Sequence, residues 1–361
     1  MIMPHLIGKV ILQKNKKNNL LVRNASQLAK AGLITDQNHE FLDEVAAKYK
    51  LSITPTILAL IKRGDLNDPI ARQFVPNAAE MNISNKEASD PIGDKNHSPM
   101  KGLVHRYPDR VLLMPTFSCP VYCRYCFRRD RVGHGTTVPN YTDLERAIDY
   151  IQKNDFIREV ILTGGDPLIL SDTKLKFLVH SLNKISHLNN LRIHTRVPIA
   201  SPGRITSSLL RVLQTELPIW IALHCNHPRE LSQEAQTACK RLIDGGLPMI
   251  SQTVLLKGVN NDIEVMTDLM RKLIRLKIKP YYIHHPDRAP GTSHFQITIE
   301  EGLSIVEGLR GTISGLCQPT YVLDIPGGYG KTPLTRETVI ANNLGWTIRD
   351  YKGQEHFYPR T

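Results

Sequence analysis

The sequence predicts an α/β fold in which an N-terminal helical region precedes an incomplete barrel of parallel strands, of the (βα)6 type. Short apolar runs alternate with helix-like segments from residue 110 onward. This alternation is typical of parallel strands joined by right-handed crossovers. Six repeats are too few for a complete eight-unit barrel. A doubly wound open sheet is the alternative architecture.

Residues 1–100 are predicted to form the helical region and an irregular connector. The segment 36–49 places Phe41, Leu42, Val45 and Ala46 on one helical face. Pro55 suits the first turn of another helix. Residues 77–100 are rich in Asn and Ser, contain Pro91 and Gly93, and lack periodicity, which indicates a connector rather than regular structure.

The catalytic barrel is predicted to span residues 101–333. Its apolar runs lie at 111–115, 159–163, 191–197, 218–223, 248–255 and 280–283, and a seventh lies at 321–325. The helical segments are expected at 142–154, 172–185, 204–216, 229–244, 262–277 and 299–314, several with Ser, Thr, Asp or Asn where helix caps belong. Residues 334–361 are interpreted as a short polar tail that packs on a partner chain.

Charge and cysteine content limit the function classes. The net charge of +12 fits anionic partners such as nucleotides, phosphate cofactors or RNA. Long basic blocks are absent and aromatic residues make up 6%, so a nucleic-acid surface is not indicated. No stretch reaches the length of a transmembrane helix. The six cysteines do not resemble a disulfide framework, and a reducing cytoplasm is the expected location.

The strongest chemical motif consists of Cys119, Cys123 and Cys126, directly after the first apolar run. Thiolates suit iron–sulfur clusters and zinc. A structural zinc site normally has four protein ligands, whereas three leave a coordination position open. The next cysteine, Cys225, is far downstream. The motif therefore favours an open-coordinated cluster over a zinc knuckle or three buried apolar cysteines.

Polar residues follow the other apolar runs, where ligands gather in parallel α/β folds. Gly164 and Gly165 let backbone groups approach a ligand, and Asp166 adds an acceptor for an ammonium, although the same stretch is also a good turn. Gln252 suits a ribose hydroxyl or a buried hydrogen-bonded amide. His224 begins a histidine- and cysteine-containing stretch that fits either zinc or the polar lining of a strand end.

Lys331 lies in a glycine-rich stretch after the seventh apolar run. Glycines allow a lysine to reach into a site, and a desolvated lysine is a competent amine for a covalent bond to a carbonyl cofactor. An anion-binding loop or a hinge is the alternative. The spacing does not match a Walker phosphate-binding loop.

Together these motifs resemble the lysine 2,3-aminomutase family of radical S-adenosylmethionine (SAM) enzymes, over residues 102–333. The resemblance implies an isomerase that converts L-lysine to β-lysine by 1,2-amino migration. It implies a 4Fe–4S cluster, SAM and pyridoxal 5′-phosphate (PLP) as cofactors, and an electron-donor protein as a partner. Radical SAM enzymes also adopt incomplete barrels.

The resemblance also implies a role for each site residue. Cys119, Cys123 and Cys126 would hold the cluster. Gly164, Gly165 and Asp166 would bind the amino group of SAM. His224 would face the SAM pocket, and Gln252 would bind a ribose hydroxyl of SAM. Lys331 carries PLP, and Arg106 contacts its phosphate. Arg128 pairs with the substrate carboxylate, while Asp287 and Asp324 bind its side-chain ammonium.

Two positions depart from the family pattern, and other assignments remain open. Tyr125 replaces a histidine common in the family, and no cysteine follows Cys317, so the intersubunit zinc of many members, and with it the homo-oligomer, stays open. A glutamate aminomutase would require cations or amides at Asp287 and Asp324. A second branch of the family forms the β-lysine that is used to modify a translation elongation factor. Its members usually lack the Asp-x-Pro-Gly-Gly arrangement that this sequence has at 324–328. A zinc-knuckle RNA-binding protein is the alternative outside enzymes.

Overall fold

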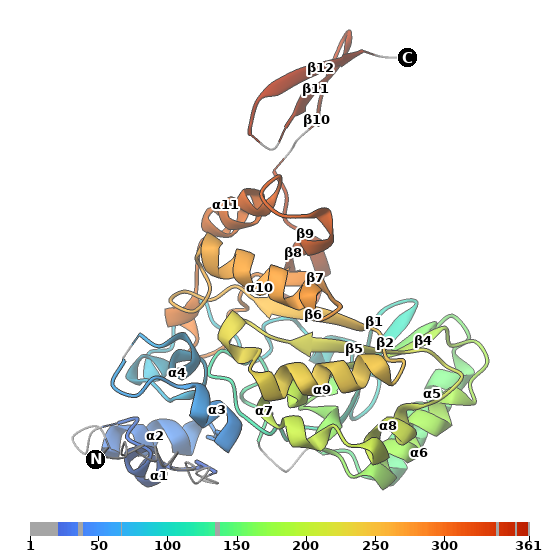
Figure 1. Ribbon diagram of the computed structural model, residues 1–361. Coiled ribbons are helices and arrows are strands. Elements are labelled where there is room, and N and C mark those ends of the chain that lie inside the picture. Colours follow the sequence, from blue (N-terminus) through green and yellow to red (C-terminus); the bar gives the residue numbers. More distant parts are fainter. Residues whose placement is uncertain are drawn as a thin grey trace, which may run out of the picture.

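A nine-stranded sheet with strands in sequence order, β1 to β9, organises the structure (Figure 1). The computed structural model describes residues 21–34, 39–65, 67–133, 138–336, 339–350 and 352–359. Seven strands are parallel: β2 (Arg110–Thr116), β3 (Glu159–Gly164), β4 (Asn190–Thr195), β5 (Ile219–His224), β6 (Met249–Val254), β7 (Ile278–His284) and β8 (Thr320–Ile325). The predicted incomplete α/β barrel is confirmed, and the seventh apolar run is its last parallel strand.

Two antiparallel edge strands, which the apolar pattern did not reveal, flank the parallel ones. They are β1 (Leu103–Tyr107), paired with β2, and β9 (Gly330–Pro333), paired with β8. The two edges meet through a side chain, since the backbone N–H of Lys331 donates to the Tyr107 hydroxyl at 2.6 Å. A Cβ atom at position 330 would lie 2.8 Å from that hydroxyl, so this approach requires glycine. The barrel is therefore closed by a side-chain contact.

Helices in the crossovers bury apolar faces against the sheet. They are α5 (Tyr141–Lys153), α6 (Asp172–Asn183), α8 (Ser207–Leu213), α9 (Gln233–Asp244), α10 (Ile263–Arg275) and α11 (Ile299–Leu309). Asn140, Ser171 and Asp262 cap three of them with side-chain oxygens, as capping preferences predict. Within the described residues, no helix combines the length and apolar character needed to cross a membrane.

Two predicted helices begin later than expected. The fourth starts at Gln233 because Ser232 caps it, and the residues before it form a short 3-10 turn, Pro228–Glu230. The third is split: α7 (Val197–Ala200) and a 3-10 turn, Pro202–Arg204, precede α8, which Thr206 caps. In both cases proline near the start of the short turn and a downstream cap set the boundaries.

The N-terminal helices lie beside the barrel (Figure 1). They are α1 (Ala25–Lys30), α2 (His39–Lys48), α3 (Pro55–Leu60) and α4 (Pro69–Phe74). Phe74 and Ile57 are fully buried in the main hydrophobic core. The connector after α4 is irregular, as predicted, with 3-10 turns at Ala78–Met81 and Lys95–His97. Its Glu80 and Asp94 are buried against the barrel.

The C-terminal segment contains a second, three-stranded antiparallel sheet. It consists of β10 (Val339–Asn342), β11 (Gly345–Arg349) and β12 (Glu355–Pro359). This sheet lies apart from the barrel in Figure 1. The sequence suggested only a polar tail here, because the strands are short. Packing of this segment on a partner chain stays a prediction.

Candidate active site

A cavity of about 540 Å³ extends from the carboxyl ends of the parallel strands into the barrel. All thirteen site residues expected from the sequence line it: Arg106, Cys119, Cys123, Cys126, Arg128, Gly164, Gly165, Asp166, His224, Gln252, Asp287, Asp324 and Lys331. These residues come from β1, β3, β5, β6, β8 and β9, and from the loops that follow β2, β3 and β7. The fold therefore gathers residues that are more than 200 positions apart in the sequence into one space.

The three motif cysteines lie on the loop after β2, and their thiols are free and partly exposed to the cavity. This loop is fastened to the N-terminal region: the backbone N–H of Arg124 donates to the Gln73 carbonyl at 2.8 Å, and that of Tyr122 to the Ser52 carbonyl at 3.1 Å. Removal from solvent raises the pKa of Cys126 to about 11. Three soft donors around a cavity suit an iron–sulfur cluster, which would hold them as thiolates.

The glycine pair after β3 packs backbone to backbone against the start of the cysteine loop. Gly165 donates to the Thr116 carbonyl at 2.7 Å, and Asp166 to the Ser118 carbonyl at 2.9 Å. A Cβ atom at position 165 would lie 2.2 Å from the Ser118 carbonyl oxygen, so no larger residue fits there. This contact fixes the cysteine loop relative to β3.

The Asp166 carboxylate is occupied by protein donors. One oxygen accepts from Thr195 Oγ1 and the Leu168 backbone, and the other from the backbone of Arg196 and Val197, at 2.7–3.1 Å. Burial nevertheless raises the pKa of Asp166 to about 6. Asp166 therefore holds the ends of β3 and β4 together. Direct contact between its carboxylate and a ligand ammonium would require one of these hydrogen bonds to break.

His224 and Gln252 are neighbours in register on β5 and β6, and both line the cavity. The Tyr125 hydroxyl lies 3.4 Å from His224 Nε2. Burial lowers the pKa of His224 well below its usual value, so the imidazole is neutral. The His227 side chain does not line the cavity, and its Nδ1 accepts a hydrogen bond from the Arg229 backbone N–H. Among the described residues no three His, Cys, Asp or Glu side chains converge as a single metal ion requires.

Arg106 and Arg128 share one carboxylate that the sequence did not single out, that of Asp94 in the connector. Arg128 binds one Asp94 oxygen through Nε and Nη2 at 3.0 and 2.7 Å, and Arg106 Nη2 binds the other at 3.0 Å. Burial raises the pKa of Asp94, but the two guanidinium groups outweigh burial and hold this pKa below its usual value. The connector thus orients both predicted anion-binding arginines.

Asp287, Asp324 and Lys331 form the charged end of the cavity. Lys331 pairs with Asp324 directly across the β8–β9 ladder, its Nζ 2.5 Å from Oδ2. His284 Nδ1 lies 3.5 Å from the same oxygen. The Asp287 carboxylate makes no hydrogen bond or ion pair with any part of the chain that the structure describes. Burial, reinforced by the charge of Asp324, raises the pKa of Asp287 to about 7.

Several buried polar atoms of cavity-lining residues have no hydrogen-bond partner in the described ranges. They are Arg106 Nε, Arg192 Nε, His194 Nε2 and Arg196 Nε. An unsatisfied buried donor costs about 1–3 kcal/mol. The cavity is thus equipped for ligands that carry several polar groups. His194 and Arg196 lie in the apolar run 191–197, and the sequence assigned neither residue a role. Polarity near a strand end does not by itself indicate which way a side chain points.

Comparisons with known proteins show which families the chain resembles. Residues 113–270 match the family model described as the Radical SAM superfamily. The chain is 39% identical over 333 residues to the L-lysine 2,3-aminomutase of Clostridium subterminale, covering 92% of this chain and 80% of that protein. It is 41% identical over 307 residues to the enzyme of the same description from Methanococcus maripaludis, covering 84% and 71%.

A relative with a different substrate in its name is also similar. The glutamate 2,3-aminomutase of Clostridioides difficile is 35% identical over 334 residues, covering 92% of this chain and 79% of that protein. Overall similarity therefore does not select the substrate, but it extends over most of each of these three relatives. The radical SAM match also supports a 4Fe–4S cluster and SAM as cofactors. The chain belongs to the lysine 2,3-aminomutase family of the radical SAM superfamily.

Proposed function

We propose that this protein is a SAM- and PLP-dependent lysine 2,3-aminomutase that converts L-lysine to β-lysine. The observation that carries the choice of substrate is the pair of carboxylates, Asp287 and Asp324, which line the same cavity as Lys331 and Arg128. A one-electron donor protein and a reducing cytoplasm belong to the same proposal.

The cavity residues fit the groups that this reaction needs. Cys119, Cys123 and Cys126 would hold the cluster, Lys331 would carry PLP, and Arg106, with an unpartnered Nε, would face its phosphate. When bound, the cluster and SAM supply a radical that removes hydrogen from the substrate, and PLP carries the migrating nitrogen. The task of the chain is to orient lysine and to exclude water.

The charges around Asp324 favour a cationic substrate. Lys331 now supplies the cation that pairs with Asp324. If the Lys331 amine is committed to PLP, Asp324 loses that cation, and Asp287 has no cationic partner within the described structure. Two carboxylates near one another in a cavity are then stabilised as anions by a positive charge between them. The side-chain ammonium of lysine provides it, whereas a glutamate side chain would add a third negative charge.

Arg128 is placed to bind the other end of the substrate. Its Nε and Nη2 are engaged by Asp94, and its Nη1 has no hydrogen bond to any described residue. A guanidinium held on one edge can present its remaining N–H groups to a carboxylate without losing further side-chain entropy. Arg128 and the two aspartates would thus bind opposite ends of an extended amino acid.

Replacing Asp287 or Asp324 by asparagine should strongly impair lysine turnover. Removal of one member of a buried ion pair costs about 3–5 kcal/mol, or roughly two to four orders of magnitude in kcat/KM. Steady-state kinetics under anaerobic conditions measure this effect, with SAM and PLP binding as controls for the site. Asp172→Asn is the matched control, because Asp172 pairs with Arg204 outside the cavity. Normal lysine turnover by both cavity variants would refute the substrate assignment.

Lysine use should also depend on pH through Asp287. Since its pKa is raised to about 7, Asp287 is neutral below this pH and becomes a carboxylate above it. We expect kcat/KM for lysine to rise about tenfold per pH unit below 7 and to level off above 7. Comparison of the pH profiles of wild type and Asp287→Asn tests this expectation. If kcat/KM of the variant rises with pH in the same way, a group other than Asp287 causes the rise.

A further inference from the structure

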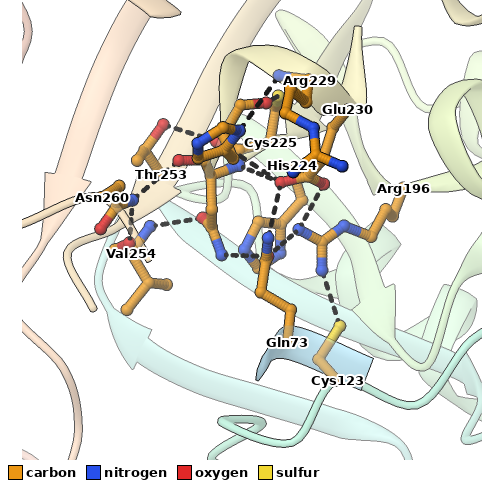
Figure 2. Close-up of polar contacts among 12 residues, drawn as sticks. Gln73, Cys123, Arg196, His224, Cys225, Arg229, Glu230, Thr253, Val254 and Asn260 are labelled. Carbon is orange, nitrogen blue, oxygen red and sulfur yellow. Dashed lines mark hydrogen bonds and ion pairs between the residues drawn. The ribbon is translucent and has the colours of Figure 1, made fainter. Parts of the chain in front are cut away.

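Arg196, at the end of β4, connects a cluster cysteine to a buried carboxylate (Figure 2). Its Nη1 donates to Cys123 Sγ at 2.8 Å and to the Tyr125 hydroxyl at 2.5 Å. Its Nη2 donates to Gln73 Oε1 at 3.1 Å and to Glu230 Oε2 at 2.8 Å. Arg196 is 5% exposed, so its charge lies where water screens it little.

The far side of this guanidinium is rigidly held. Glu230 is fully buried, and its Oε1 accepts from the Gln73 side chain and from the backbone of Asn226 and His227 at 2.9–3.1 Å. Gln73 comes from α4, so the N-terminal helical region takes part in this network. With its partners fixed, Arg196 presents Nη1 to Cys123 in one orientation.

The three cysteines do not share this environment. Among the described residues, Cys123 is the motif cysteine whose sulfur accepts a hydrogen bond from a charged side chain. Charge-assisted hydrogen bonds are roughly twice as strong as neutral ones. The cluster would therefore meet an asymmetric electrostatic environment.

We propose that Arg196 is a positioning residue that holds Cys123 Sγ and raises the reduction potential of the cluster, with Glu230 moderating its charge. The proposal rests on the assignment of a 4Fe–4S cluster to the cysteine loop. Reduction adds one electron and hence negative charge to the cluster. A fixed positive charge and a hydrogen bond at a ligating sulfur stabilise the reduced form more than the oxidised form.

The test compares anaerobically reconstituted wild type, Arg196→Gln and Glu230→Gln by redox titration followed by electron paramagnetic resonance. For Arg196→Gln we expect an about tenfold lower ratio of reduced to oxidised cluster at a fixed potential, or about 59 mV for one electron. For Glu230→Gln, which leaves the Arg196 charge unopposed, we expect a shift in the opposite direction. Arg196→Lys keeps the charge and should lie closer to wild type than Arg196→Gln.

Opposite shifts in two variants separate an electrostatic role from general damage to the fold. Arg204→Gln is the matched control, because that guanidinium binds Asp172 and the carbonyls of Leu168 and Leu170 and does not line the cavity. An unchanged potential in iron-loaded Arg196→Gln, or shifts of the same sign in both variants, overturns the proposal. If Arg196→Gln loads no iron, Glu230→Gln alone tests the proposal. A higher reduction potential than wild type supports the proposal, and an unchanged or lower potential overturns it. A wild type without an iron–sulfur signal refutes the cluster itself.

Discussion

Replacing Cys123 by alanine should abolish the reductive cleavage of SAM, and the same is expected for Cys119 and Cys126. Each thiol lines the cavity, and no fourth cysteine among the described residues does, so the loss of one leaves two ligands for a cluster that needs three. The expected effect is complete loss of 5′-deoxyadenosine formation together with a large loss of iron and sulfide. Both are measured on protein reconstituted under anaerobic conditions.

Cys239→Ala provides the matched control for these variants. Cys239 is a buried thiol on α9 and does not line the cavity, so its removal changes packing without touching the candidate cluster. It should retain wild-type iron content and SAM cleavage. Wild-type iron and deoxyadenosine levels in any of the three motif variants would remove the basis for the cluster assignment.

Lys331→Ala should eliminate covalent attachment of PLP and all turnover of lysine, while SAM cleavage and iron content persist. Lys331 is placed for this task because its backbone N–H is bound by Tyr107 and its amine enters the cavity beside Asp324. Borohydride reduction followed by peptide mapping should locate a pyridoxyl group on Lys331.

The control for the PLP experiment is Lys257→Ala. Lys257 also lies near glycine in the sequence, but it is exposed and does not line the cavity. This variant should bind PLP as wild type does. Recovery of the pyridoxyl group on Lys257, or a normal PLP absorbance spectrum in Lys331→Ala, would contradict the assignment.

The parallel strands and the site at their carboxyl ends could be predicted because one physical rule links them. Buried parallel strands are apolar throughout, so the polar residue that ends each run is conspicuous. Gly164, His224 and Asp324 stand at such strand ends, and all three line the cavity. Because the strands are parallel, their carboxyl ends, and with them these residues, lie at the same edge of the sheet.

Residues of the connector could not be assigned from sequence. Asp94 and Glu80 are acidic residues in a segment without periodicity, and their neighbours give no sign that they are buried. Glu80 pairs with Arg124 and Arg129, and Asp94 with Arg106 and Arg128. Such pairs are defined by tertiary contact between segments, which local pattern does not encode.

The short edge strands escaped prediction for a related reason. β9 has four residues including glycine and proline, and its place depends on β8 and on Tyr107 rather than on its own propensity. The antiparallel β10–β12 sheet was missed because its strands of four or five residues lack clear alternation. In both cases pairing with a neighbouring strand, rather than composition, determines the structure.

Lysine 2,3-aminomutase activity is tested by anaerobic incubation of the reconstituted protein with L-lysine, SAM, PLP and a reductant, with the product identified by nuclear magnetic resonance. Parallel incubations contain L-glutamate in place of lysine. We expect β-lysine to form only when SAM and PLP are both present, with little conversion of glutamate. Preferential conversion of glutamate, or SAM cleavage without any β-lysine, would contradict this expectation.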